Sequence, residues 1–142
     1  MEISLTIDRQ CPAKARPRLG RNKVFDSQSA QKHIWRALLL QSTEREAIKA
    51  YLDDIVSVSV TCEFGMKIPG AISKRKAEVL DGQFHTKKPD IDNLLKWVFD
   101  VGNGILWPDD NCISKCVALK QYTKTPYTRV SVQYKLKESD GQ

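Results

Sequence analysis

The chain lacks the features that mark several large classes of protein. No stretch approaches the run of about 18 apolar residues that a membrane span requires, and the 142 residues include only two histidines and four cysteines. Met1 leads directly into an alternating pattern rather than a basic and then apolar leader, so we expect no secretory signal, no membrane partner and a cytoplasmic location. Thiols are reduced in that compartment, which argues against a disulfide framework.

Zinc is not expected either. Cys112 and Cys116 have three residues between them, but there is no second compact pair of ligands that could complete a tetrahedral site. His33 and His85 are isolated in the sequence. A Gly-rich phosphate-binding loop is also missing, which removes the common nucleotide-binding classes. The four cysteines are therefore interpreted as buried or unused thiols.

Positive charge is abundant and unevenly distributed. The formal net charge is +6, and no acidic residue interrupts the basic segment between Asp8 and Asp26. A positive balance attracts polyanions, nucleic acid first. Phosphate contacts of this kind orient DNA and make its binding salt-dependent without reading sequence. The candidate DNA-binding residues are Arg16, Arg18, Arg21, Lys87 and Lys88, and for each of them taken alone the alternative is a solvated surface charge.

The length and the hydrophobic fraction of 41% predict one globular domain over residues 1–142 with a core of its own. Alternation at Ile3, Leu5 and Ile7 predicts a first strand. A basic loop over 9–23 follows, ending in a short strand near 23–25. Asp26 or Ser27 can then cap a helix. The expected apolar face of this helix consists of Ala30, Ile34, Ala37, Leu38 and Gln41. A second helical pattern begins at Ser42, and its apolar residues are Ala47, Ile48, Tyr51 and Leu52.

Strict alternation predicts another strand over 55–64. A long loop over 65–89 follows, with a short helix near 73–80, and connections of this length are usually functional or mobile. A helix from Asp90 to about Gly102 or Gly104 comes next. Two strands, 113–122 and 127–136, are expected to form a hairpin through 123–126, before a frayed tail over 138–142. The expected fold is a small α+β domain with a mixed or antiparallel sheet and two main helices.

Two carboxylates stand where the long loop becomes a helix. Asp90 and Asp92 are two residues apart, and at a helix start the first can belong to the loop and the second to the first turn, so both can bend toward one point. Magnesium typically takes one or two carboxylates together with waters and substrate phosphate. The alternative is that these residues only cap the helix, whose N-terminus favours negative charge in any case.

Lys96 lies four residues after Asp92 and hence on the same helix face. It could neutralise charge on a pentacovalent phosphate, or orient or deprotonate the attacking water; a solvated ion pair is the alternative. Asp100, another four residues along, could hold the Lys96 ammonium from behind, or form an ordinary helix salt bridge.

An acidic turn follows the helix at Trp107-Pro108-Asp109-Asp110-Asn111. Folded back beside the helix start, it would add a third carboxylate, and three carboxylates with a lysine suit metal-assisted phosphodiester hydrolysis. The alternative is an ordinary polar turn. Other acidic motifs fit less well: an EF-hand needs ligands beyond the opening pair at Asp90 and Asp92, and a phosphatase nucleophile should follow a buried apolar strand rather than Thr-Lys-Lys-Pro.

These residues resemble a known family, the RusA-type Holliday junction resolvases of phages, prophages and bacteria. The resemblance rests on the run HTKKPDIDNLLK at 85–96, followed by FD at 99–100 and WPDD at 107–110, and more loosely on KARPR at 14–18. It implies a bacterial, phage or prophage origin and a homodimer of mixed α/β fold that cuts four-way DNA junctions by paired nicks in DNA recombination and repair.

Carried over position by position, the resemblance implies that Asp90, Asp92 and Asp110 bind Mg²⁺, with Mn²⁺ as a substitute, and that Lys96 is the essential lysine. Asp109 matches the companion acid of the pair, and Asn93 is expected to support the metal ligands from behind. A twofold dimer suits the approximate twofold symmetry of a four-way junction. Two alternatives stay open at this point: a DNA-binding protein without catalysis, and a metal-dependent phosphodiesterase acting on other DNA or RNA structures.

Overall fold

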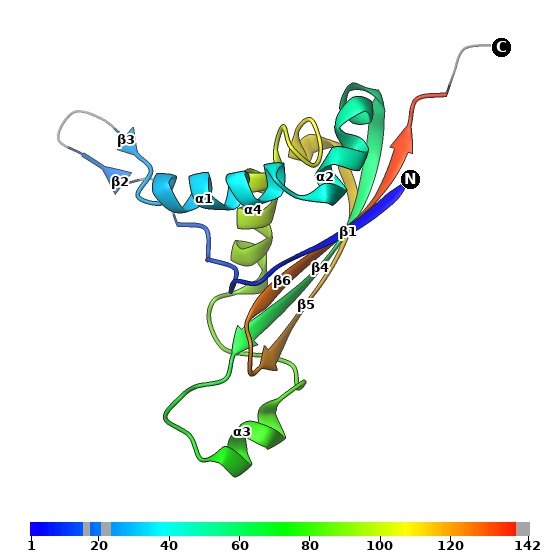
Figure 1. Cartoon of the computed structure of the whole chain (residues 1–142). Coiled ribbons are helices and arrows are strands. Elements are labelled where there is room, and N and C mark those ends of the chain that lie inside the picture. The colour runs from blue at the N-terminus through cyan, green and yellow to red at the C-terminus, as the bar shows by residue number, and fades with distance from the viewer. Residues whose placement is uncertain (16–17, 21–23, 139–142) are drawn as a thin grey trace.

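The computed structural model describes residues 1–15, 18–20 and 24–138, with only the backbone of 18–19 and 24–25. Its centre is a four-stranded mixed sheet in the order β1-β6-β4-β5, built from β1 (Glu2–Ile7), β4 (Ile55–Lys67), β5 (Ile113–Thr123) and β6 (Tyr127–Leu136) (Figure 1). A separate pair of two-residue strands, β2 (Arg18–Leu19) and β3 (Val24–Phe25), lies at the end of an arm that projects from the body of the protein. The expected α+β class with a mixed sheet is confirmed.

The longest strand, β4, lies inside the sheet because it can bury one face along its whole length. Every second side chain from Val58 to Met66 is buried, with relative exposures of 0–1%. Neighbouring strands supply matching apolar positions, so that Val60 stands between Cys116 on β5 and Val132 on β6. Alternation predicted this strand, and the structure extends it three residues further, to Lys67.

The expected hairpin between the last two strands is wrong. β5 and β6 are not neighbours: β4 lies between them, parallel to β5 and antiparallel to β6. Residues 124–126 therefore cross the end of β4 instead of forming a tight turn within one ladder. The turn residues correctly marked the end of β5 and the start of β6. They carry no information about a third strand, β4, that ends 46 positions before β5 begins and is inserted between the two.

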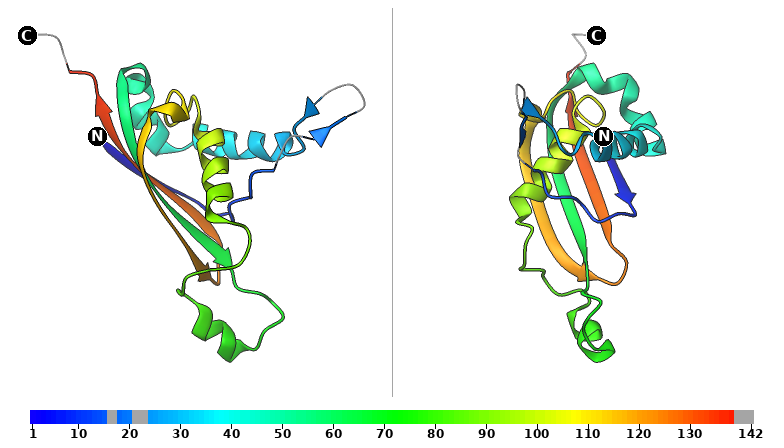
Figure 2. Two further views of the ribbon diagram at one scale, coloured as in Figure 1. Left: turned by 180° about the vertical axis from the view of Figure 1, so that it is seen from behind. Right: turned by 90° about the vertical axis from the view of Figure 1, so that its left-hand side faces the viewer.

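Three helices gather on one side of the sheet: α1 (Ser29–Leu40), α2 (Thr43–Ile48) and α4 (Ile91–Gly102) (Figures 1 and 2). The structure also has α3 (Lys74–Leu80) and the 3₁₀ turns η1 (Lys49–Asp54) and η2 (Asp110–Cys112). α1 and α4 meet through Trp35 and Trp97, whose rings pack edge to face at 6.0 Å. α3 stands apart at the far end of the loop after β4. No helix in the described part of the chain is long and apolar enough to cross a membrane.

The buried face of α1 differs from the one expected. Trp35 and Leu39 are buried, whereas Ile34 and Leu38 keep 45% and 37% of their surface exposed. Two apolar pairs at i, i+4 spacing lie side by side on this helix, so spacing alone does not choose between them. The indole of Trp35 buries the larger apolar area, which decides the orientation.

The helix ends were predicted with mixed success. Ser42 does begin the second helix, where its side chain accepts a hydrogen bond from the Arg45 backbone. The N-cap of α1 is Gln28 rather than Asp26 or Ser27, and Asp26 instead accepts a hydrogen bond from the Gln28 backbone N–H. Of the predicted C-terminal tail, 139–142 lies outside the described residues.

Candidate active site

The start of α4 presents two exposed carboxylates. Asp90 is the N-cap, with φ −67° and ψ 147°, and its carbonyl accepts the first helical hydrogen bonds from Asn93 and Leu94. Its side chain makes no capping hydrogen bond, so the carboxylate is available to another partner. Asp92 follows in the first turn, and both residues are exposed. The polar side of the helix faces outward because Leu94, Trp97, Val98 and Val101 anchor the opposite side in the core.

Lys96 lies one helical turn after Asp92, as the spacing predicted. Its Nζ is 3.8 Å from the Asp92 carboxylate, and the two side chains retain 63% and 66% of their exposure. A solvated pair at this distance contributes only a few tenths of a kcal/mol, about 0.3–0.5. Neither partner is therefore held in place, and the ammonium can turn toward an incoming phosphate.

A hollow of about 410 Å³ lies beside these residues. Its walls are Ala13, Lys88, Pro89, Asp90 and Asn93. The N-terminal segment forms one wall because Lys14 donates its backbone N–H to the Asn93 carbonyl at 3.0 Å. The hollow therefore brings together residues from two distant parts of the sequence, with Asp90 and Lys88 supplying opposite charges at its edge.

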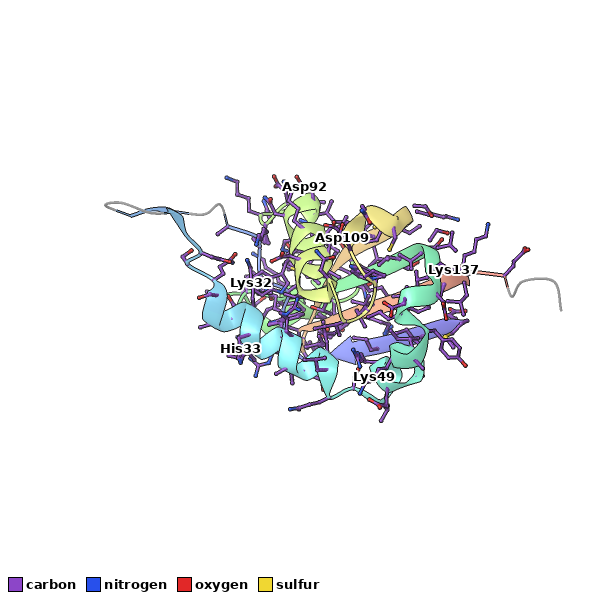
Figure 3. The ribbon with its side chains drawn as sticks, turned by 90° about the horizontal axis from the view of Figure 1, so that it is seen from above. Lys32, His33, Lys49, Asp92, Asp109 and Lys137 are labelled. Carbon is purple, nitrogen blue, oxygen red and sulfur yellow. The ribbon has the colours of Figure 1, made fainter. Side chains whose placement is uncertain are left out.

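The acidic turn after α4 is anchored at the opposite end of that helix. Trp107 is fully buried, packs edge to face on Phe99 at 6.2 Å, and donates its indole N–H to Asn103 at 2.9 Å. Two residues later Asp109 caps η2 and accepts a hydrogen bond from the Asn111 backbone. In Figure 1 this turn lies beside the C-terminal end of α4, and Figure 3 looks down from above with Asp92 and Asp109 labelled.

One chain therefore holds the predicted metal ligands in two places. Asp90 and Asp92 stand at the start of α4, and Asp110 stands in the turn that follows its end. The 12 residues of the helix correspond to roughly 18 Å at about 1.5 Å per residue. Among the described residues, no group of three or more histidine, cysteine, aspartate or glutamate side chains is close enough to hold a metal ion.

The expectation that Asp100 holds Lys96 from behind is wrong. Asp100 instead accepts hydrogen bonds from Lys14 and Lys32, each with Nζ 3.0 Å from its carboxylate, and Lys32 also pairs with Asp26. Burial raises the pKa of Asp100, but the hydrogen bonds from the two lysines outweigh it and hold that pKa below its usual range. Asp100 thus joins α4 to α1 and to the N-terminal segment.

The structure describes the side chains of two of the five candidate DNA-binding residues. Lys87 and Lys88 are exposed in the loop that leads into Asp90. Arg16 and Arg21 lie outside the described residues, and of Arg18 only the backbone, in β2, is described. The two lysines therefore place positive charge directly next to the acidic residues.

Two contacts near the site were missed by reasoning from the sequence. Lys120 on β5 donates hydrogen bonds to the carbonyls of Lys87 and Pro89, and Lys14 reaches Asp100. The sequence did contain a sign of the Lys120 contact. Lys120 shares one side of its strand with Cys116, Ala118 and Tyr122, and a lysine on an apolar side needs a specific partner. No local signal identifies the partner of Lys14.

A comparison with protein families gives one match. The model of the family described as endodeoxyribonuclease RusA matches residues 10–133 of the 142, a range that includes both ends of α4 and the turn after it. No curated protein matches the chain.

Proposed function

Because the chain belongs to the RusA family of endodeoxyribonucleases, we propose that it resolves four-way DNA junctions by paired symmetric nicks that require Mg²⁺ or Mn²⁺. Family membership makes it a hydrolase of phosphodiester bonds in DNA that acts on Holliday junctions. The dependence on a divalent metal ion, the pairing of the nicks and the roles of individual residues are our proposal.

The observation that carries the proposal is the arrangement at the start of α4. Two exposed carboxylates, Asp90 and Asp92, stand beside a hollow, and the ammonium of Lys96 lies one turn away. A helix that needed only a cap would use the Asp90 side chain to bond its own backbone, and this side chain does not. Exposed carboxylates next to an exposed ammonium favour chemistry on a phosphate over a purely structural role.

The ligands at this position suit a hard divalent cation. Carboxylate oxygens are what Mg²⁺ and Mn²⁺ prefer, and magnesium is usually bound by one or two of them with water completing its shell. Asp90 and Asp92 would hold the ion. When bound, such an ion supplies an activated water and stabilises the leaving oxygen of the phosphodiester.

The remaining residues are assigned by their positions. Lys96 would neutralise charge developing on the phosphate, or orient the attacking water. Asn93 lines the hollow and would support Asp90 from its side. Lys87 and Lys88 would contact phosphates flanking the cleaved bond, and Arg16, Arg18 and Arg21 stay in the proposal as DNA contacts.

The third carboxylate leads us to propose a homodimer in which Asp110 reaches the site of the other subunit, with Asp109 beside it. Within one chain, Asp90 and Asp92 lie at the start of α4 and Asp110 lies after its end, and no three acidic side chains among the described residues are close enough to hold a metal ion. A twofold axis can bring the start of α4 in one copy against the acidic turn of the other, and it does so twice. Two equivalent sites are what paired nicks in opposing strands of a junction require.

A cleavage assay tests this proposal. Purified protein is incubated with labelled four-way junction, flap, linear duplex and RNA hairpin, with and without Mg²⁺. We expect symmetric nicks in the junction that depend on the metal ion. Binding without nicking under any divalent ion would instead indicate a DNA-binding protein without catalysis, and equal cleavage of the other substrates would indicate a general phosphodiesterase.

Matched variants assign the residues. Asp90→Asn and Asp92→Asn should retain junction binding and lose cleavage, and asparagine at position 90 remains a good N-cap, so the helix is preserved. Asp53→Asn is the control, because Asp53 is exposed and lies in η1. Cleavage that survives both substitutions in α4 would refute the assignment.

A further inference from the structure

The segment that leads to Asp90 first pairs with the free edge of β5, through an isolated antiparallel bridge between Phe84 and Gln121. Gly82 donates its N–H to the Tyr122 carbonyl at 2.9 Å, Tyr122 donates to Gln83 at 2.9 Å, and His85 donates to Lys120 at 3.0 Å. The imidazole of His85 is buried and packs on the Tyr122 ring at 4.7 Å. This ladder therefore fixes the chain as far as His85, five residues before Asp90.

Beyond His85, side-chain bonds replace the backbone ladder. Lys120 extends its ammonium to the carbonyl oxygens of Lys87 and Pro89, both at 2.7 Å. Pro89 has no N–H and cannot donate to a neighbouring strand. Hydrogen bonds from a charged donor are shorter and stronger than neutral ones. Three residues of irregular backbone are thus held at two points by one cation.

The second of these carbonyls belongs to the peptide unit that joins Pro89 to Asp90. From this geometry we propose that Lys120 is a positioning residue of the acidic site: its two hydrogen bonds set where the loop delivers Asp90 to the start of α4. This inference rests on the function proposed above. It adds a residue from a different strand, 30 positions along the chain from Asp90, to those the reaction needs.

The expected loss of cleavage rate on replacing Lys120 can be estimated from the usual cost of a misplaced catalytic group. A displacement of about 1 Å at a reacting centre can cost roughly 100-fold in rate. The loss should appear in the rate of cleavage more than in junction affinity, because Lys120 uses its ammonium on main-chain carbonyls. We expect Lys120→Met to slow single-turnover cleavage by about 10- to 100-fold, and Lys120→Arg, which can still donate to carbonyls, to recover much of the rate.

A direct test of the hydrogen bonds needs no activity. Trypsin can cut the bond between Lys87 and Lys88, whose side chains are exposed, and it should do so faster when this segment detaches from β5. Lys120→Met should therefore be cut there at least several-fold faster than the wild type. The control is Lys115→Met, on the same strand: Lys115 is exposed and lies an odd number of residues from Lys120, so it points to the other face of the sheet. Unchanged protection in Lys120→Met would overturn the proposal.

The two measurements separate the possible failures. Lost protection with cleavage as fast as in Lys115→Met would show that Lys120 holds the loop without positioning the site, and would also overturn the inference. If the wild type itself does not cut junctions, the proposed function fails, and the digestion still reports on the loop. Should Lys120→Met not fold, Lys120→Leu, which also lacks a donor, takes its place under the same two criteria.

Discussion

Lys14 places its ammonium 3.0 Å from the carboxylate of Asp100, across 86 positions of sequence. Its backbone N–H is bonded to the Asn93 carbonyl, and the Cys11 thiol contacts the Leu94 carbonyl at 3.6 Å. The segment before the arm is therefore fastened along the same helix that carries Asp92 and Lys96. The N-terminal segment up to Lys14 therefore has a defined position relative to the acidic site.

The charge network at Asp100 should make stability depend on pH. Because the folded pKa of Asp100 is depressed, its contribution is fully present above the unfolded pKa of about 3.9 and is lost as pH falls through the folded value. We expect Asp100→Asn to lower the free energy of unfolding by about 1 kcal/mol near neutral pH, a figure kept small because the side chain is partly exposed. Urea denaturation at several pH values should show the difference from wild type shrinking in acid. A difference that does not change with pH would contradict this account.

Mixed dimers test whether Asp110 acts on the partner's site. Asp92→Asn and Asp110→Asn should each be inactive, but a heterodimer of the two would rebuild one intact site if the ligands come from different copies. With random association, about a quarter of the wild-type sites should return, giving single rather than paired nicks. Asp90→Asn mixed with Asp92→Asn is the control and should stay inactive. If the first mixture is equally inactive, the three carboxylates act within one copy.

The loop lysines should determine part of the salt dependence of binding. Replacing Lys87 and Lys88 with alanine removes two proposed phosphate contacts, so the slope of log K against log salt should become shallower by roughly 2. Lys49→Ala/Lys137→Ala is the matched control, because Figure 3 shows these lysines well away from Asp92. Fluorescence anisotropy with a labelled junction at several salt concentrations measures both slopes. Equal slopes for the two double variants would remove Lys87 and Lys88 from the DNA interface.

The join between α4 and the acidic turn depends on a close contact at Gly102. A Cβ at this position would lie 2.6 Å from Cζ2 of the buried Trp107 ring. Gly102→Ala should therefore destabilise the fold by about 1–3 kcal/mol, offset by up to about 1 kcal/mol from the better helix propensity of alanine. Gly70→Ala is the control, since nothing lies within 4 Å of a Cβ there. Chemical denaturation compares the two, and equal stabilities would show that the Trp107 ring can move aside.

Those parts of the fold that depend on neighbouring residues were predictable. Alternation found β1, β4 and the bounds of β6, and the apolar stripe after Asp90 found α4, because each pattern repeats within a few residues. Two expectations failed where the competing arrangements are locally equivalent. On α1 the pairs Ile34/Leu38 and Trp35/Leu39 have the same spacing, and the second pair is buried because Trp35 buries its large indole against Trp97. The residues of a connection between two strands show the same turn pattern whether or not a third strand lies between those strands in the sheet.

The residues of the candidate site also fall into those predictable from local sequence and those whose contacts depend on tertiary packing. Asp90, Asp92 and Lys96 lie within two helical turns, so their place at one helix start could be predicted from spacing alone, as could the run of residues that resembles the RusA family. The position of Asp110 after the other end of α4, the pairing of Asp100 with Lys14 and Lys32, and the hydrogen bonds from Lys120 to the loop before Asp90 became known from the folded chain. Helix geometry is set by hydrogen bonds between residues four apart, whereas these contacts depend on how strands and helices far apart in the chain pack on one sheet.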